Sequence, residues 1–186
     1  MNRIGTQPLE TRRLVLRRFT VEDAEAMYRN WASDPEVTRY LTWPCHPSPE
    51  ATAALLEDWV RQYEDGSVFS WAIQSKETGE PIGNIAVVKL EERVDAAEIG
   101  YCLGRAFWGQ GLMTEALRAV MAFLFDKGEI RRITARHDAR NPASGRVMQK
   151  AGMRYEGTLR QAGRNNQGIC DLICYGALRS DSRMPG

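Results

Sequence analysis

The chain has 186 residues, of which 43% are hydrophobic and 26% are charged, a composition typical of a globular protein that buries a core without disulfides or a metal. Its 25 Lys and Arg residues against 24 Asp and Glu residues give a net charge of +1, which does not favour binding to nucleic acid or to a membrane surface. No apolar run approaches the roughly 18 residues that a membrane helix needs, and residues 1–10 lack the apolar stretch of a signal peptide. We therefore expect one cytoplasmic domain over residues 1–186, with an ordered core from about 8 to 180.

In the N-terminal half, apolar spacing and capping residues predict a strand, two helical segments and three further strands. Thr20 has an acidic residue three positions on, as in a capping box, and begins a helical region that ends at Asp34-Pro35. Ser48-Pro49 begins a longer helix, which Gly66 ends. The expected elements are a strand at 14–19, helical segments at 20–34 and 48–66, and strands at 68–75, 82–90 and 97–103.

In the C-terminal half, the pattern predicts two helices and three strands. Apolar residues recur at helical spacing from Gly111 to Lys127, and Gly128 follows at the position that favours glycine after a helix. Asn141-Pro142 is typical of a helix start, and this short helix ends before Gly152. The strands are expected at 130–136, 153–159 and 169–178, the last two around a polar loop at 163–168. Together the elements predict an α+β domain with a mostly antiparallel sheet.

The cysteines do not predict a disulfide or a metal site. The four are Cys45, Cys102, Cys170 and Cys174. Cys170 and Cys174 fall in one expected strand, where four residues separate their Cα atoms by roughly 13 Å, beyond the roughly 7 Å limit for a bridge. No Cys-x-x-Cys pair occurs, and the two histidines are far apart in the sequence. We expect reduced, mostly buried thiols and no bound metal.

Residues 106–116, with the sequence AFWGQGLMTEA, lie between an expected strand and an expected helix. Two glycines at such a junction let backbone N–H groups converge at a helix N-terminus, which suits a phosphate group. A dinucleotide-binding fold would require a third glycine where Thr114 stands, and a P-loop would require a Gly-Lys-Ser/Thr sequence that is absent. The stretch therefore predicts a phosphate-bearing cofactor in a different fold.

Further motifs surround this loop. They are TRRLVLR at 11–17, AEIGY at 97–101, WGQGLMTEA at 108–116, NPAS at 141–144, MQKAGM at 148–153 and EG at 156–157. In this order and spacing the chain resembles the GCN5-related N-acetyltransferase (GNAT) superfamily, in its RimJ/RimL-like branch of ribosomal-protein alanine N-acetyltransferases. The resemblance implies an α+β fold with four helices and a mixed, mostly antiparallel sheet of seven strands, of which the fourth and fifth splay apart.

The resemblance implies acetyl-coenzyme A as the acetyl donor. Its pyrophosphate would bind the backbone amides at the start of the third helix, where the helix dipole favours negative charge. These residues are Trp108, Gly109, Gln110, Gly111, Leu112 and Met113. Ala106 departs from the Gln or Arg that the family usually has three residues before the first glycine. The alternative is a glycine turn that serves only tight packing.

The pantetheine arm would lie between residues 97–103 and 130–136. A backbone N–H near Cys102 or Leu103 would polarise the thioester carbonyl. The family reacts by direct attack of the amine, and the Cys102 thiol has no evident activating partner, so we expect no acyl-enzyme. Asn141 would cap its helix and contact the pantetheine. Lys150 and Arg146 would reach the adenosine phosphates, or simply face solvent.

Direct transfer needs a group that removes the amine proton and one that assists the leaving thiolate. Glu98 matches the family position for a base acting through water, and its alternative role is a cross-strand ion pair. Glu156 is a second candidate base or a turn residue. The usual acid, a Tyr, is replaced by Met148, so Ser144 is the candidate, with Tyr101 or Tyr155 as substitutes and a plain helical residue as the alternative.

The acceptor is the least defined part of the prediction. Residues 37–44 would line its entrance, and Trp71 and Asn84 are further candidates. We expect a primary amine, such as the N-terminal amine of a ribosomal or other protein. The alternatives are a small-molecule amine (a polyamine, an amino acid or an aminoglycoside) and a CoA-binding module without catalysis. An acidic pocket would favour a polycation and an open groove a peptide. Relatives in this branch also imply a homodimer.

Overall fold

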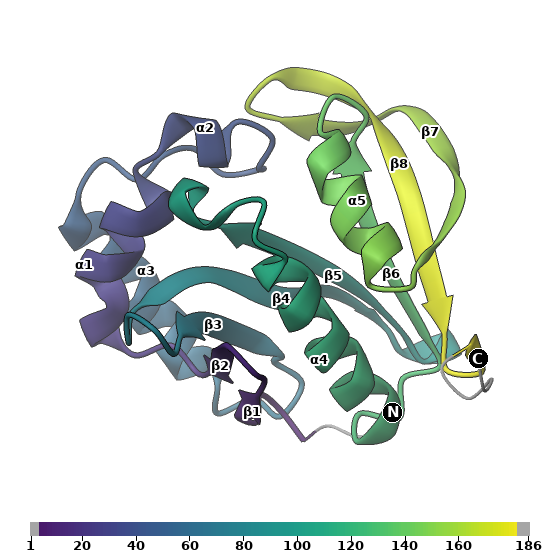
Figure 1. Ribbon diagram of the computed structural model, residues 1–186, viewed down its shortest axis with the longest axis horizontal. Helices are drawn as coiled ribbons and strands as arrows, with labels where there is room; N and C mark the ends of the chain where they lie inside the picture. The colour runs from purple at the N-terminus through teal and green to yellow at the C-terminus, as the bar shows by residue number, and fades with distance from the viewer. Residues whose placement is uncertain (1–3, 182–186) are drawn as a thin grey trace.

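The computed structural model describes residues 4–181, which form one mixed sheet of eight strands with helices on both faces (Figure 1). The strand order is β1-β2-β3-β4-β5-β6-β8-β7, and every neighbouring pair is antiparallel except β5 and β6. The strands are β1 (Leu9–Glu10), β2 (Leu14–Arg17), β3 (Ser70–Ser75), β4 (Pro81–Glu91), β5 (Ala96–Leu103), β6 (Arg132–Asp138), β7 (Arg154–Asn165) and β8 (Gly168–Leu178).

This architecture confirms the predicted α+β fold but corrects the strand count from seven to eight. The additional strand is β1, whose two residues pair with Val15 and Leu16 of β2. A two-residue strand is too short to show an alternating pattern in the sequence.

The described residues form five α-helices, one more than the four expected. They are α1 (Ala24–Met27), α2 (Pro35–Thr38), α3 (Pro49–Gln62), α4 (Leu112–Asp126) and α5 (Pro142–Lys150). The expected helix at 20–34 is irregular, because a 3₁₀ turn precedes α1 and a π turn follows it. Asp34 then caps a separate one-turn helix through a bond from the Glu36 N–H to its carboxylate, at 2.9 Å. The predicted caps Ser48 and Asn141 accept from backbone N–H groups at the starts of α3 and α5.

Two apolar clusters hold the helices against the sheet. The larger lies under α4, where Leu117, Val120 and Leu124 are fully buried together with side chains of the central strands. The smaller lies on the opposite face, where Trp31 and Leu56 pack with Cys102 of β5. Successive β5 side chains therefore face different helix layers, as a strand requires.

The parallel pair β5 and β6 separates after a short contact (Figure 1). β5 pairs with β4 along its whole length, but it pairs with β6 only over Ala96–Glu98, opposite Arg132–Thr134. β6 continues to Asp138 beside β8. Residues 99–103 of β5 therefore have a strand partner on one side only, which confirms the predicted splay and forms a wedge between the two strands.

The C-terminal hairpin is longer than the sequence predicted. β7 extends through the expected polar loop to Asn165, with a register irregularity between Leu159 and Gly163 and a positive φ of 51° at Gln161. β7 is an edge strand that is exposed for most of its length, so its side chains carry no alternation between apolar and polar residues. The hairpin turn is limited to Asn166 and Gln167.

Candidate active site

The glycine loop leads from the end of β5 into α4. Gly109 and Gly111 have φ values of 74° and 76°, in the left-handed region that favours glycine. A Cβ on Gly109 would meet no heavy atom within 4 Å, and one on Gly111 would meet only a nitrogen of Arg13, at 3.7 Å. Close packing therefore does not explain the two glycines, whereas the backbone conformation does. α4 begins at Leu112 without a side-chain cap, so its first N–H groups have no side-chain acceptor.

Arg13 and Glu115 hold this loop against the start of β2. The Arg13 Nη1 donates to the carbonyl of Gln110 at 3.0 Å, and its Nε donates to Glu115 at 2.7 Å. The same carboxylate accepts from the Arg13 backbone N–H at 2.9 Å and from the Thr11 hydroxyl at 2.6 Å. Burial opposes the charge, but these bonds lower the pKa of Glu115 below its usual range. The sequence motifs at 11–17 and 108–116 contain these two residues, but their pairing could not be predicted because 102 residues separate Arg13 from Glu115.

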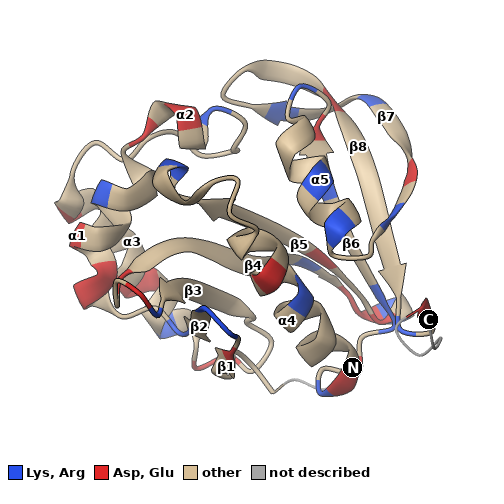
Figure 2. Cartoon of the chain, viewed as in Figure 1, with Lys and Arg blue, Asp and Glu red and all other residues tan. Residues whose placement is uncertain are grey.

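A groove of about 730 Å³ adjoins the loop. Its lining residues are Thr11, Arg13, Gly111, Thr114, Glu115, Arg118, Ala119 and Lys150. Basic residues lie on both helices that border it, α4 and α5 (Figure 2), and the Arg118 guanidinium donates to the Lys150 carbonyl. The structure thus brings Lys150 to the same groove as Gly111, whereas Arg146 does not line it.

Tyr101 connects β5 to α5 inside the wedge. Its hydroxyl donates to the carbonyl of Ser144 at 3.0 Å and lies 3.0 Å from the Ser144 Oγ. Asn141 caps the same helix turn by accepting from the Ser144 N–H at 3.4 Å. Burial raises the pKa of Tyr101 far above its usual value, so the phenol stays protonated. The structure therefore brings Ser144, Asn141 and Tyr101 together, while Tyr155 lies on β7 with an exposed side chain.

Cys102 faces the other helix layer. Its thiol donates to the Asn84 carboxamide oxygen at 2.8 Å, among the buried residues of the smaller cluster. Burial raises the pKa of Cys102 to about 12, so the thiol is neutral near pH 7 and a poor nucleophile.

Both candidate bases are engaged in ion pairs with arginines. Glu98 accepts from the Arg136 Nε at 2.8 Å and from its Nη2 at 2.7 Å, which is the cross-strand pair that the sequence left open. Glu98 is the last β5 residue that pairs with β6, so this ion pair lies where the wedge begins. Glu156 binds Arg132, at the paired end of β6, and this guanidinium lowers the pKa of Glu156. Of the two glutamates, Glu98 lies closer to the separated part of the strands, because it directly precedes residues 99–103 of β5.

The expected entrance segment, residues 37–44, contacts the tip of the β7–β8 hairpin. The Asn166 side chain donates to the carbonyls of Thr38 and Trp43, each at 2.8 Å. Its backbone N–H donates to the carbonyl of Leu41 at 3.2 Å. Trp71, by contrast, is fully buried, packs edge-on against Phe123 and belongs to the core under α4.

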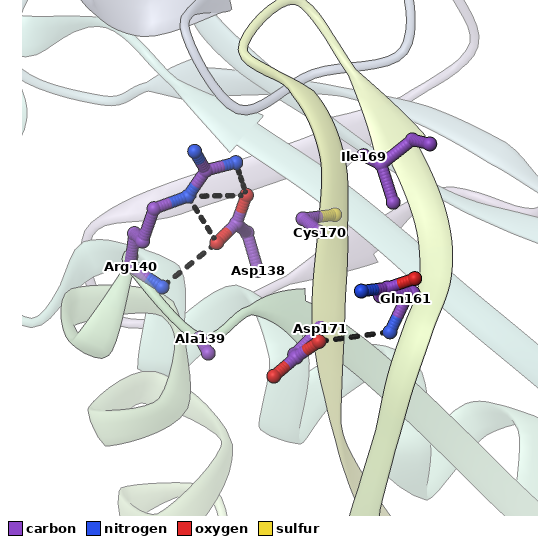
Figure 3. Close-up of a pocket in the computed structure, with 7 residues that line it drawn as sticks. All are labelled: Asp138, Ala139, Arg140, Gln161, Ile169, Cys170 and Asp171. Atoms are coloured by element: carbon purple, nitrogen blue, oxygen red, sulfur yellow. Dashed lines mark hydrogen bonds and ion pairs between the residues drawn. The ribbon is translucent and has the colours of Figure 1, made fainter.

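A second cavity, of about 400 Å³, lies beside the hairpin at the end of β6 (Figure 3). Its polar wall is the buried Asp138, which accepts from the backbone and guanidinium of Arg140 and from the side chain of Asn165, at 2.7 to 3.2 Å. These bonds hold the pKa of Asp138 well below its usual range, and the bond from the Arg140 guanidinium contributes most. Sequence reasoning missed this pair, because an Asp two residues before an Arg is a common surface pattern.

Within residues 4–181, no helix is long and apolar enough to cross a membrane. In the same part of the chain, the His, Cys, Asp and Glu side chains form no group of three or more that could hold a metal ion. All four cysteines are free thiols, and two of them, Cys102 and Cys170, are buried.

Comparison with known proteins identifies similar chains. The family model described as "Acetyltransferase (GNAT) domain" matches residues 13–154. The uncharacterized N-acetyltransferase YoaA of Bacillus subtilis is 35% identical over 92% of this chain and 96% of its own length. The ribosomal-protein-serine acetyltransferase of Escherichia coli is 31% identical over 74% of this chain and 76% of its own length.

Solved structures share the fold. RimL, a ribosomal α-N-protein acetyltransferase solved in complex with coenzyme A, superposes with a TM-score of 0.82 at 25% identity, covering 92% of this chain and 98% of RimL. A GNAT-family acetyltransferase from Bacillus anthracis superposes with the same TM-score at 24% identity, covering 94% of this chain and 99% of that protein.

Proposed function

Because the chain belongs to the acetyltransferase (GNAT) domain family, in its RimJ/RimL-like branch, we propose that it transfers the acetyl group of acetyl-CoA to the N-terminal amine of a protein. Acetyl transfer to an amine is the activity of the family. The donor, the acceptor and the residue roles given below are our proposal.

The observation that carries the donor assignment is the glycine loop. Gly109 and Gly111 adopt left-handed conformations beside open space at the uncapped start of α4. N–H groups at such a helix start suit a pyrophosphate. The adjoining groove adds Arg118 and Lys150, whose positive charge suits the remaining phosphate of coenzyme A. The RimL structure that superposes on this chain contains coenzyme A, which supports the same donor.

The wedge between β5 and β6 suits the pantetheine and the thioester. Residues 99–103 of β5 have no strand on the β6 side. The Leu103 carbonyl accepts from the Trp108 indole N–H at 2.6 Å, and the other outward backbone groups of this stretch are placed to bind an extended chain. An N–H near Cys102 or Leu103 would polarise the thioester carbonyl. Ser144, whose hydroxyl lies 3.0 Å from that of Tyr101 on β5, stands in the first turn of α5, and Asn141 caps this helix.

Glu98 is the better candidate base, acting through a water that takes the amine proton. Arg136 occupies one position on each carboxylate oxygen, and each oxygen keeps a second lone pair that can accept from a water. The amine would lose its proton to this water, and its nitrogen would then attack the acetyl carbon directly. Glu156 is less favoured, because it pairs with Arg132 where the two strands are still joined.

Paired charges on β5 and β6 favour a peptide over a polycation. Glu98 and Asp138 are both neutralised by arginines, Arg136 and Arg140. A polyamine or an aminoglycoside would be attracted by unpaired carboxylates, which these two do not supply. A peptide whose N-terminal amine is followed by uncharged residues is compatible with carboxylates that are already paired.

An acceptor panel tests the proposal. The protein would be incubated with acetyl-CoA and peptides that begin with Ser or Ala, and free CoA thiol would be measured. Matched controls are the same peptides with a blocked N-terminus and an internal Lys, together with spermidine, single amino acids and an aminoglycoside. We expect turnover that depends on the free N-terminus. Turnover confined to a small amine would contradict the acceptor assignment, and acetyl-CoA binding without turnover on any acceptor would contradict the enzyme assignment.

A further inference from the structure

Tyr101 and Ser144 meet where β5 and β6 have already separated. Tyr101 lies three residues beyond Glu98, the last β5 residue paired with β6, and its ring packs against the core under α4. Its hydroxyl is 3.0 Å from both the carbonyl oxygen and the Oγ of Ser144. Ser144 stands in the first turn of α5, which Asn141 caps. Packing therefore fixes one partner of this contact and a helix cap fixes the other.

The two hydroxyls have two protons and can be arranged in two ways. In one, Tyr101 donates to the Ser144 carbonyl, and the Ser144 hydroxyl donates back to the phenol oxygen. In the other, Tyr101 donates to the Ser144 Oγ, and the Ser144 proton is free to reach a third atom. When the phenol O–H points to the Ser144 Oγ, the Ser144 proton cannot be donated back to the phenol and is available to the wedge.

We propose that Tyr101 is a positioning residue, which donates to the Ser144 Oγ and thereby directs the Ser144 proton toward the sulfur that leaves the thioester. This inference rests on the proposed function. In the step, the amine nitrogen bonds to the acetyl carbon, the C–S bond breaks with its electron pair on sulfur, and the amine proton passes to water. The thiolate accepts the hydrogen bond of Ser144 and then takes a proton from water, so neither hydroxyl is consumed.

Burial supports this division of roles. It raises the pKa of Tyr101 far above its usual value, so a relay that left a phenolate behind would be unfavourable. Tyr101 therefore acts as a donor that keeps its proton. Met148, one turn after Ser144 on α5, has no proton to offer and is almost fully buried.

The test compares Tyr101→Phe with a matched variant, Tyr175→Phe. Tyr175 lies on β8, and its hydroxyl accepts from the Gln149 side chain at 2.9 Å, near the other end of α5. Each variant removes one hydroxyl that links the sheet to the same helix. We expect kcat to fall roughly 10- to 100-fold in Tyr101→Phe, as for loss of a hydrogen bond that serves a developing charge. KM for acetyl-CoA should stay within about 3-fold of wild type, and Tyr175→Phe should keep its kcat within about 2-fold.

Ser144→Ala, alone and with Tyr101→Phe, completes the cycle, and the single Ser144→Ala variant does not depend on how well Tyr101→Phe folds. We expect Ser144→Ala to lose as much kcat as Tyr101→Phe, and the double variant to lose no more than either. Losses that multiply, or a kcat kept within about 2-fold in Ser144→Ala, would overturn the inference. If wild-type protein acetylates an acceptor and Tyr101→Phe retains its kcat, only this inference fails. A wild-type protein inactive on every acceptor would overturn the proposed function with it.

Discussion

Replacing Gly111 by Ala perturbs the glycine loop through the backbone alone. The φ of Gly111 is 76°, and a left-handed conformation costs an L-residue about 1–2 kcal/mol. A Cβ there would approach only the end of the Arg13 side chain, at 3.7 Å, so steric exclusion does not contribute. The free loop is expected to relax to a conformation with negative φ, which turns its N–H groups away from one another.

Binding of acetyl-CoA must then restore the strained conformation. A penalty of 1–2 kcal/mol corresponds to a Kd raised by about 5- to 30-fold, measurable by isothermal titration calorimetry. The matched control is Gly152→Ala, because Gly152 has a φ of 97°, no heavy atom within 4 Å of its Cβ position, and a location after the end of α5.

The Gly152→Ala control should leave the Kd for acetyl-CoA unchanged and should lower only the stability of the fold. The same strain lowers the melting temperature by about 2–8 °C in a chain of this size. Gly111→Trp, which adds bulk at the same point, should abolish binding. The reasoning is refuted if Gly111→Ala and Gly152→Ala bind acetyl-CoA equally well, because the loop conformation would then not contribute to binding.

Three further predictions follow from side-chain contacts. Cys102→Ala should keep kcat within about 3-fold, since a neutral thiol with a pKa of about 12 takes no part in the transfer; a loss above 100-fold would contradict this. Glu115→Gln should weaken the brace between Arg13 and the loop and raise KM for acetyl-CoA more than KM for the acceptor, as steady-state kinetics would reveal. Asp138→Asn should lower the melting temperature at pH 7, because the pKa of Asp138 is depressed mainly by Arg140. A carboxylate whose pKa is depressed in the folded state stabilises the fold at pH values above its unfolded pKa of about 3.9, and this stabilisation is lost as the pH falls below that value. The difference in melting temperature between Asp138→Asn and wild type should therefore narrow below about pH 4. A difference that stays constant with pH would refute the ion-pair explanation.

Local signals in the sequence predicted much of the fold. The caps at Ser48 and Asn141 and the apolar stripe of α4 are strong over short distances, and the three helices begin within one residue of the expected positions. The predicted end of α3 is too late, because the helix stops at Gln62 and not at Gly66. β1 and the far half of β7 were missed for a common reason. A two-residue strand and an exposed edge strand bury no alternating face, so tertiary pairing rather than side-chain pattern defines them.

The candidate site likewise has parts that the sequence predicted and parts that only the tertiary structure reveals. The glycine loop is a contiguous motif, and its positive φ values follow from the residue type. The contacts that organise the site join residues far apart in the chain, such as Tyr101 with Ser144 and Arg13 with Glu115. Sequence reasoning named Glu98 without choosing between a base and an ion pair, because only the register of β5 against β6 brings Arg136 within reach.

The most direct test of the account follows the acetyl group itself. The protein would be incubated with acetyl-CoA that carries an isotopically labelled acetyl group and with a peptide that begins with Ser, and both products would be examined by mass spectrometry. We predict one label on the N-terminal nitrogen of the peptide and none on the protein. A label retained on the protein at Cys102, or a peptide that stays unlabelled while acetyl-CoA binds, would contradict direct transfer from a donor held by the glycine loop.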